Sequence, residues 1–271
     1  MRWRLCSSYW QLKLWWCNPL NDARHAGDSA RLEVRIARKT YRAASGTSLE
    51  VLRDIAITLF RGEVGVLVGP SGCGKTTMLR LISGVDRDFD GAIVTPVPGK
   101  LAMVFQEPRL LPWRNVEDNV RLVAPDADAA TITMLFDVLE LTPHRAHYPG
   151  ELSLGLARRV ALARAFAVDP DILLLDEPFV SLDEALASRL RDELATLVQN
   201  RAMTTLLVTH DLDEAVRLAD RLFLLSPRPA RVLAEVPIRT PRHCRNASDF
   251  AAAKSDVVRR LEAPPNQSAA V

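Results

Sequence analysis

The sequence predicts an α/β fold in which a mostly parallel sheet is covered by helices on both faces. Two observations support this prediction. Short apolar runs of strand length alternate with helical segments along most of the chain, as happens when helices connect parallel strands. A glycine-rich stretch over residues 69–74 follows one of these runs directly and leads into a helix. A mainly helical block over residues 115–168 interrupts the alternation and predicts an inserted subdomain.

The predicted strands come first. Four runs are apolar or alternate apolar with charged residues, as buried or half-exposed strands do: 32–36, 49–60, 64–68 and 101–105. A helix is expected over residues 75–83, where Gly84 can end it. A proline-punctuated loop over residues 107–113 then leads into the helical block, which is expected to break at Pro125 and around residues 143–150.

The alternation resumes after the helical block. Four more strands are expected, at residues 172–175, 205–208, 222–225 and 232–236. Leucines spaced by four, four and three residues form a stripe on one helix face between the first two of these strands, at positions 186, 190, 194 and 197. A second helix is expected over residues 213–219, and a third near residues 249–261. The sequence thus predicts a globular domain over residues 31–240 and a C-terminal tail over residues 241–271.

Composition and charge exclude several classes of protein. Hydrophobic residues make up 48% of the 271 residues and charged residues 25%, as in ordinary soluble globular proteins, so disorder of the whole chain is excluded. The net charge is +2, but residues 31–240 carry 26 basic and 28 acidic side chains. This domain lacks the strong positive field that nucleic-acid binding requires, so no nucleic-acid partner is expected.

The cysteines and the apolar runs indicate in which cellular compartment the protein is expected. Four cysteines are scattered along the chain without a Cys-x-x-Cys pair, so neither a zinc site nor a disulfide framework is indicated. Reduced thiols in a cytoplasmic protein are the simplest interpretation. No apolar run reaches the roughly 18 residues that would span a bilayer.

The N-terminal segment has an unusual composition. Residues 1–20 hold Trp3, Trp10, Trp15 and Trp16, and polar residues interrupt any apolar core of a signal peptide. The favoured interpretation of residues 1–30 is a disordered extension, or a start codon assigned too far upstream. The alternative is an anchor at a membrane surface, which tryptophan and basic side chains suit.

The strongest motif occupies residues 69–77 and matches Gly-x4-Gly-Lys-Thr between a strand and a helix. In such a loop, backbone N–H groups and the helix N-terminus bind phosphate oxygens. Lys75 would reach the β- and γ-phosphates, and Thr76 would ligate Mg²⁺. The candidate phosphate-binding residues are Gly69, Pro70, Ser71, Gly72, Cys73, Gly74, Lys75, Thr76 and Thr77. The alternative, a chance glycine-rich turn, fits this context poorly.

The second motif is an apolar run that ends in two acids, Asp176 and Glu177. In open α/β sheets, ligands bind at the carboxyl ends of the strands. Asp176 can hold the metal through its water shell, and Glu177 is placed to polarise an attacking water as general base. Alone, the two acids could form a solvated turn. Paired with the phosphate loop, the two acids fit a solvated turn poorly and fit the metal-binding and general-base roles better.

With these motifs in place, residues 31–240 resemble the ATP-binding subunits of ABC transporters. The resemblance implies a P-loop NTPase core with a mostly parallel sheet, an antiparallel β subdomain and an inserted helical subdomain over about residues 107–168. It also implies that two identical subunits close over two ATP molecules.

The resemblance assigns further site residues. Gln106 corresponds to the glutamine that contacts Mg²⁺ and the attacking water, and His210 to the histidine that contacts the γ-phosphate. Residues 181–183 resemble the D-loop, with Asp183 as a nucleotide-site residue. Tyr41 resembles the aromatic residue that stacks on adenine. Taken alone, His210 would more often be structural and Tyr41 a packing residue; the order and spacing of the whole set are specific.

One motif departs from the family pattern. The family signature reads Leu-Ser-Gly-Gly-Gln, whereas residues 152–156 read Leu-Ser-Leu-Gly-Leu. The groups that hold the partner subunit's γ-phosphate in the family are kept as Ser153 and Gly155. Leu154 stands where the family pattern has a flexible glycine, and Leu156 stands where it has the polar side chain of glutamine. We therefore expect weakened but not abolished hydrolysis; alternatively, either leucine packs against the helical subdomain.

The loop over residues 105–113, Phe-Gln-Glu-Pro-Arg-Leu-Leu-Pro-Trp, resembles that of importers of nitrate, sulfonate, taurine and related solutes. This resemblance implies a separate transmembrane permease, which residues 107–120 would contact, with Leu111 and Trp113 as its apolar anchors or as packing residues of the subdomain. It also implies an indirect periplasmic or extracellular solute-binding protein, and a peripheral location at the cytoplasmic face of the membrane.

Other functions stay open at this point. A soluble ABC-type ATPase acting on nucleic acid or ribosomes would share the nucleotide motifs, but usually has two cassettes, zinc inserts or long coiled coils in one chain. A P-loop kinase or GTPase fits poorly with Gln106, with the acidic pair after residue 175 and with His210. A nucleotide-binding subunit that no longer hydrolyses ATP is kept open by the altered signature.

Overall fold

The computed structural model describes residues 32–42, 46–96, 99–180 and 182–262. The predicted extension over residues 1–30 therefore lies outside the described residues, as do Ser181 of the predicted D-loop and the end of the predicted C-terminal tail.

The core is a six-stranded sheet with the order β5-β6-β7-β3-β8-β9. Its strands are β3 (Val64–Val68), β5 (Leu101–Val104), β6 (Ile172–Asp176), β7 (Thr204–Thr209), β8 (Arg221–Leu225) and β9 (Val232–Pro237). The first five strands of the spatial order pair in parallel, and only β9 pairs antiparallel, with β8. The predicted mostly parallel sheet is thus confirmed.

A second, antiparallel sheet has the order β2-β1-β4. It consists of β1 (Leu32–Arg42), β2 (Ser48–Leu59) and β4 (Asp90–Val94). Residues 90–94 were not predicted as a strand, because none of the five is buried and the strand forms an edge. Gly91 is required there, since a Cβ would lie 2.1 Å from the Arg35 carbonyl oxygen.

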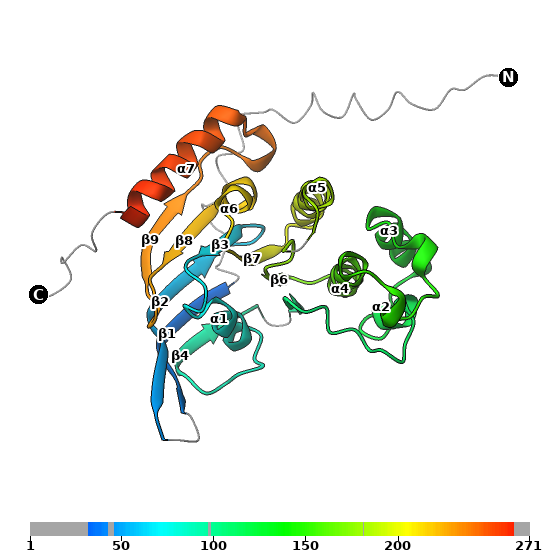
Figure 1. The fold of residues 1–271 in the computed structure, drawn as a ribbon, viewed down its shortest axis with the longest axis horizontal. Helices are drawn as coiled ribbons and strands as arrows, with labels where there is room; N and C mark the ends of the chain where they lie inside the picture. The colour runs from blue at the N-terminus through cyan, green and yellow to red at the C-terminus, as the bar shows by residue number, and fades with distance from the viewer. Residues whose placement is uncertain (1–31, 43–45, 97–98, 181, 263–271) are drawn as a thin grey trace, which may run out of the picture.

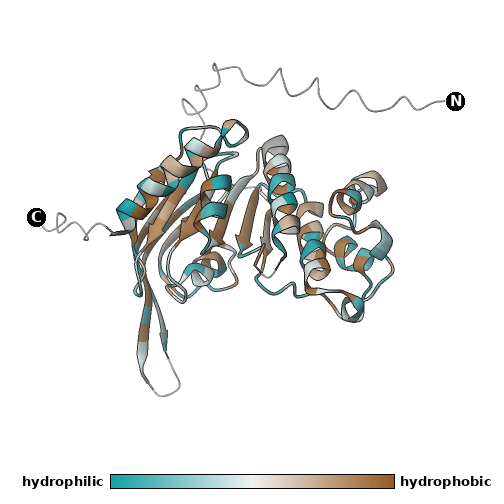
Figure 2. Cartoon of the chain, turned by 45° about the horizontal axis from the view of Figure 1, so that its top comes forward, coloured by the Kyte–Doolittle hydropathy of each residue, from teal (hydrophilic) through white to brown (hydrophobic). Residues whose placement is uncertain are grey.

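Side chains of the central strands alternate between the two faces of the main sheet, so that Val66 and Leu67 belong to different hydrophobic clusters. The antiparallel sheet and α1 (Lys75–Ile82) cover the face of Leu67. The other face is covered by helices that include α5 (Glu184–Arg201), α6 (Leu212–Leu218) and α7 (Ala247–Glu262). Figures 1 and 2 show these layers and the apolar strands between them.

The predicted helical block forms a lobe to the right of the sheet in Figure 1, on the side where β5 is the edge strand, and it shares a hydrophobic cluster with the sheet. It contains α2 (Val116–Arg121), α3 (Ala129–Val138) and α4 (Leu154–Ala167), with short 3₁₀ turns at Thr142–His144 and Pro149–Glu151. The buried Asn119 fixes the preceding loop, because its side chain accepts from the Leu111 N–H at 2.8 Å and donates to the Arg114 carbonyl at 2.9 Å. In the described part of the chain, no helix is both long and apolar enough to cross a membrane.

Candidate functional site

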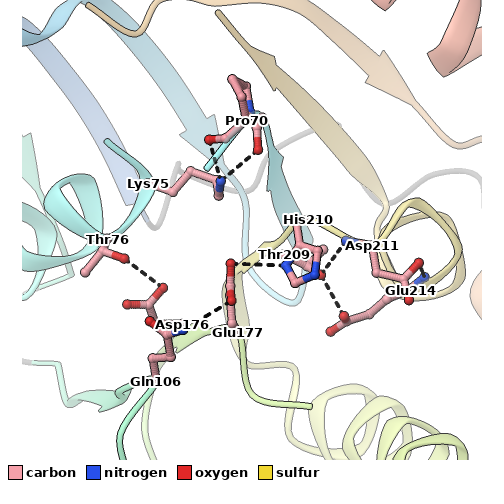
Figure 3. A network of polar contacts seen from close by, with 11 residues as sticks. Pro70, Lys75, Thr76, Gln106, Asp176, Glu177, Thr209, His210, Asp211 and Glu214 are labelled. Carbon is pink, nitrogen blue, oxygen red and sulfur yellow. Dashed lines mark hydrogen bonds and ion pairs between the residues drawn. The ribbon is translucent and has the colours of Figure 1, made fainter. Parts of the chain in front are cut away.

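Four adjacent parallel strands bring most of the predicted site residues to one edge of the sheet. Gln106 follows β5, Asp176 ends β6, His210 follows β7, and the loop after β3 leads to Lys75. These strands are parallel neighbours in the order β5-β6-β7-β3, so their carboxyl ends open on the same side. Figure 3 shows the resulting cluster of polar side chains.

The phosphate loop has the geometry of an anion site. The Lys75 ammonium group donates to the carbonyls of Gly69 at 2.7 Å and Pro70 at 3.0 Å. No side chain caps the N-terminus of α1, and its first turn holds no acidic residue. Its N–H groups are therefore available to a negatively charged ligand. Gly74 (φ 128°) leaves no room for a side chain, because a Cβ would lie 2.8 Å from Leu52.

Asp176 lies at the bottom of the site, with 2% of its surface exposed. Its Oδ1 accepts a hydrogen bond of 3.1 Å from the Thr76 hydroxyl. Burial raises the pKa of Asp176, and the neighbouring Glu177 acts in the same direction, whereas Thr76 and Lys75 oppose the rise. A hydroxyl and a carboxylate oxygen in contact are hard donors of the kind that Mg²⁺ prefers, so these residues fit the predicted metal.

Glu177 is the centre of the network (Figure 3). One of its carboxylate oxygens lies 3.3 Å from Nδ1 of His210, and the other accepts from Nε2 of Gln106 at 3.4 Å. Its own N–H donates to the Val208 carbonyl at 3.0 Å. The arrangement holds a carboxylate between two polar side chains next to the buried Asp176, as a general base for water would be held.

The signature residues make their contacts within α4 and with the core. The Ser153 hydroxyl accepts a hydrogen bond from the Leu156 N–H at 3.2 Å and caps the N-terminus of α4. Gly155 stands in the first turn of this helix. Leu156 packs on the core, whereas Leu154 is 50% exposed. The polar network around Glu177 contains neither Ser153 nor Gly155.

Two further candidates, Tyr41 and Asp183, make contacts of their own. The Tyr41 hydroxyl donates to Asp86 at 3.0 Å, and the Lys39 ammonium lies 4.5 Å from the centre of the ring. The structure thus joins Tyr41 to the segment that follows α1. Asp183 precedes α5 and its carbonyl accepts from the Ala187 N–H at 2.9 Å.

Three residues that sequence reasoning missed adjoin the site. The Thr209 hydroxyl donates to the buried Glu214 at 2.7 Å and accepts from the Asp211 N–H at 3.0 Å, which fixes the turn that carries His210. Burial raises the pKa of Glu214 to about 7. Its position in the first turn of a helix that begins just after His210 was a signal for it. Arg228 binds the phosphate loop through the Gly72 carbonyl, and no local pattern predicts this contact.

Comparison with known proteins gives a consistent result. Residues 52–180 match the family model described as ABC transporter. The chain is 41% identical over 218 residues to "Aliphatic sulfonates import ATP-binding protein SsuB 2" of Pseudomonas syringae pv. tomato, covering 79% of this chain and 91% of that protein. It is 36% identical over 241 residues to the SsuB protein of Bacillus licheniformis, covering 85% of this chain and 94% of the relative.

Solved structures agree. The ATP-binding cassette MJ0796, solved as a dimer in a post-hydrolysis state with ADP and Pi, superposes with a TM-score of 0.68 and 26% sequence identity. The match covers 78% of this chain and 100% of that one. A second dimeric structure of MJ0796, a bacterial ABC transporter cassette, gives a TM-score of 0.69.

Proposed function

This chain belongs to the ABC transporter family, and we propose that it is the ATP-hydrolysing subunit that powers import of a small anion, of the nitrate, sulfonate or taurine kind, through a separate permease. Support for the solute class comes from the relatives, which are named as import proteins for aliphatic sulfonates. It also comes from the loop over residues 105–113, which resembles importers of this group.

One observation carries the proposed hydrolysis. Glu177 is held between Gln106 and His210, directly after the buried Asp176 that accepts from Thr76. Two adjacent carboxylates thus have different surroundings, one buried beside a hydroxyl and one directed toward polar side chains. This division suits a metal-binding acid and a proton-accepting base.

In the proposed mechanism, Lys75 and the open N–H groups of α1 bind the phosphates of ATP. Thr76 and Asp176 would hold Mg²⁺, with Gln106 beside them. When bound, Mg²⁺ neutralises charge on the phosphate oxygens. Glu177 accepts the proton of the attacking water, and His210 contacts the γ-phosphate while holding the Glu177 carboxylate in place.

We place the complete site between two copies of the chain. Ser153 and Gly155 stand at the N-terminus of α4, outside the network of their own subunit, and would contact the γ-phosphate bound by the other copy. Asp183 and Tyr41 are proposed as further nucleotide-site residues, Tyr41 against adenine. Because ATP favours the closed pair, binding and hydrolysis can drive a conformational change in the permease.

The proposed permease contact is the loop before α2, at the cytoplasmic face of the membrane. Trp113 is 71% exposed there, and the loop is held rigidly by Asn119. An exposed tryptophan on a fixed loop suits an apolar partner surface. A solute-binding protein outside the cell would act on the permease, so this chain would not touch the solute.

A second candidate function is a subunit that binds ATP and hydrolyses it only slowly. The half-exposed Leu154 in the signature favours it.

The test is phosphate release by the purified chain with Mg-ATP. We expect E177Q to lower the rate at least about 100-fold, as loss of a general base does, while ATP binding persists. K75A serves as the control that loses binding. Comparable rates for wild type and E177Q would contradict the proposed base.

A further inference from the structure

The turn between β8 and β9 reaches the phosphate loop through one side chain. Arg228 donates to the Gly72 carbonyl from Nε at 3.1 Å and from Nη2 at 2.7 Å. Gly72 lies in the left-handed backbone region (φ 73°) inside the predicted phosphate-binding motif. A cation therefore contacts a backbone oxygen of the loop that is proposed to hold the triphosphate.

The turn itself is held on both sides, so that Arg228 has a fixed base. The Ser226 hydroxyl donates to the Pro227 carbonyl at 2.8 Å and accepts from the Arg231 N–H at 3.0 Å. The buried Ala230 joins the turn to β2, because its N–H donates to the Val51 carbonyl at 2.8 Å. Rotation of the turn away from the loop would break these contacts.

The contact between Arg228 and Gly72 affects the backbone N–H donors of the phosphate loop. The Gly72 carbonyl and the Cys73 N–H belong to one peptide unit, and this N–H donates to the Pro70 carbonyl at 3.3 Å within the loop. A cation on the Gly72 oxygen therefore helps to fix the orientation of this peptide unit and polarises its N–H. Loops of this type bind phosphate through backbone N–H groups. The guanidinium also adds positive charge close to a ligand that carries several negative charges.

We propose that Arg228 is a positioning residue of the phosphate loop that raises its affinity for nucleoside polyphosphates, more for ATP than for ADP and least for AMP. The proposal rests on the proposed function, since it assumes that the loop binds the phosphates of ATP. It assigns the β8–β9 turn a role in nucleotide binding.

Arg231 provides a matched control on the same turn. Its guanidinium pairs with Asp54 at 3.3 Å, and both side chains are exposed. R231Q therefore removes an arginine from the turn while leaving the Arg228 contact in place. Exposed pairs of this kind contribute little to stability.

The experiment measures dissociation constants of the purified chain for ATP, ADP and AMP by fluorescent-nucleotide titration and competition, together with KM and kcat for hydrolysis. We expect R228Q to weaken ATP binding about fivefold, with a smaller effect on ADP and little on AMP. KM should rise while kcat at saturating ATP stays within about twofold. R228K should recover part of the affinity, and R231Q should bind as wild type does.

Unchanged ATP affinity in R228Q would overturn the proposal, as would an equal loss for all three nucleotides, which a purely structural role predicts. If R228Q does not fold, R228K decides the question, because the loss of one of two donors should still weaken ATP binding relative to AMP. If the wild-type chain binds no ATP, the proposed function itself is contradicted. If wild type binds ATP normally and R228Q binds it equally well, only this inference is contradicted.

Discussion

Glu177 combines an unusual backbone conformation with a central place in the site. Its φ of 47° lies in the left-handed region, which a side-chain-bearing residue adopts at a cost and often at functional positions. The bend follows directly on the buried Asp176, so consecutive carboxylates point to different partners. One turns to Thr76 and the other to His210. The backbone at Glu177 is therefore what separates the two acidic roles.

Glu214 makes stability depend on pH. Burial raises the pKa of its carboxyl from the ordinary 4.5 to about 7, and Asp211 adds to the rise, while Thr209, Arg191 of α5 and His210 oppose it. Between these values the folded chain holds a proton that the unfolded chain releases. The stability contributed by this proton is complete below about pH 4.5 and is lost as the pH rises through 7.

We expect the free energy of unfolding of wild type to fall by roughly 2 kcal/mol more than that of E214Q between pH 5 and pH 8. Glutamine keeps an acceptor for the Thr209 hydroxyl but cannot titrate. Urea unfolding at several pH values measures the difference. Parallel pH profiles for the two proteins would show that Glu214 does not carry the dependence.

At the scale of single elements, the two leucines of the altered signature have different surroundings at the N-terminus of α4. Leu154 is half-exposed in the first turn, whereas Leu156 packs on the core. We expect L154G to raise the ATPase rate about threefold, because it removes an apolar side chain next to the proposed partner phosphate and restores backbone freedom. L156Q should instead destabilise the fold by about 1 kcal/mol.

Steady-state phosphate release and thermal unfolding of both variants separate these effects. An unchanged rate in L154G would mean that the altered signature does not weaken hydrolysis.

The C-terminal segment stabilises α6 through Arg245. This arginine, with 1% of its side chain exposed, donates to the carbonyls of Val216 at 2.7 Å, Arg217 at 2.9 Å and Ala219 at 2.6 Å. These carbonyls lie at the C-terminus of the helix, where no intrahelical donors remain. The segment before α7 therefore fixes the helix that carries the Asp211 turn at its other end.

We expect R245M to lower the free energy of unfolding by about 3 kcal/mol, because methionine fills the volume of the stem and leaves several carbonyls without donors. R260M, which removes an exposed ion pair with Asp256 on α7, should cost under about 0.5 kcal/mol. Urea unfolding at neutral pH compares them. Equal small losses in both variants would contradict the capping role of Arg245.

Physical reasons explain which elements and contacts could be predicted from the sequence and which could not. The strands that deliver Lys75 and Asp176 are fully buried apolar runs, so their composition alone predicts them. The edge strand β4 has no buried residue and left no pattern. The Arg228 contact joins residues 156 positions apart, and the pKa of Glu214 depends on burial. No local sequence motif indicates either the Arg228 contact or the raised pKa of Glu214.

At the scale of the whole molecule, the helical lobe is joined to the candidate site at the β5 edge. Arg164 of α4 donates to the carbonyls of Pro108 at 3.0 Å and Arg109 at 2.9 Å, in the loop directly after Gln106. Gln106 in turn contacts Glu177. The helix that Ser153 caps and the loop proposed to contact the permease are thus directly connected, and this connection would link the proposed partner subunit, the permease and the proposed base.

The proposed division of the site between two copies predicts that hydrolysis depends on protein concentration. The Ser153 hydroxyl caps its own helix, and we propose that it contacts the phosphate bound by the other copy, so an isolated copy would lack this contact. We expect the rate per subunit to fall steeply on dilution, and E177Q with ATP to elute as a dimer in size-exclusion chromatography, since ATP stabilises the closed pair without being consumed. K75A, which should not bind ATP, should elute as a monomer under the same conditions. A rate per subunit that stays constant however dilute the protein becomes would mean that one copy suffices, and the assignment of Ser153 and Gly155 to the partner's nucleotide would then be wrong.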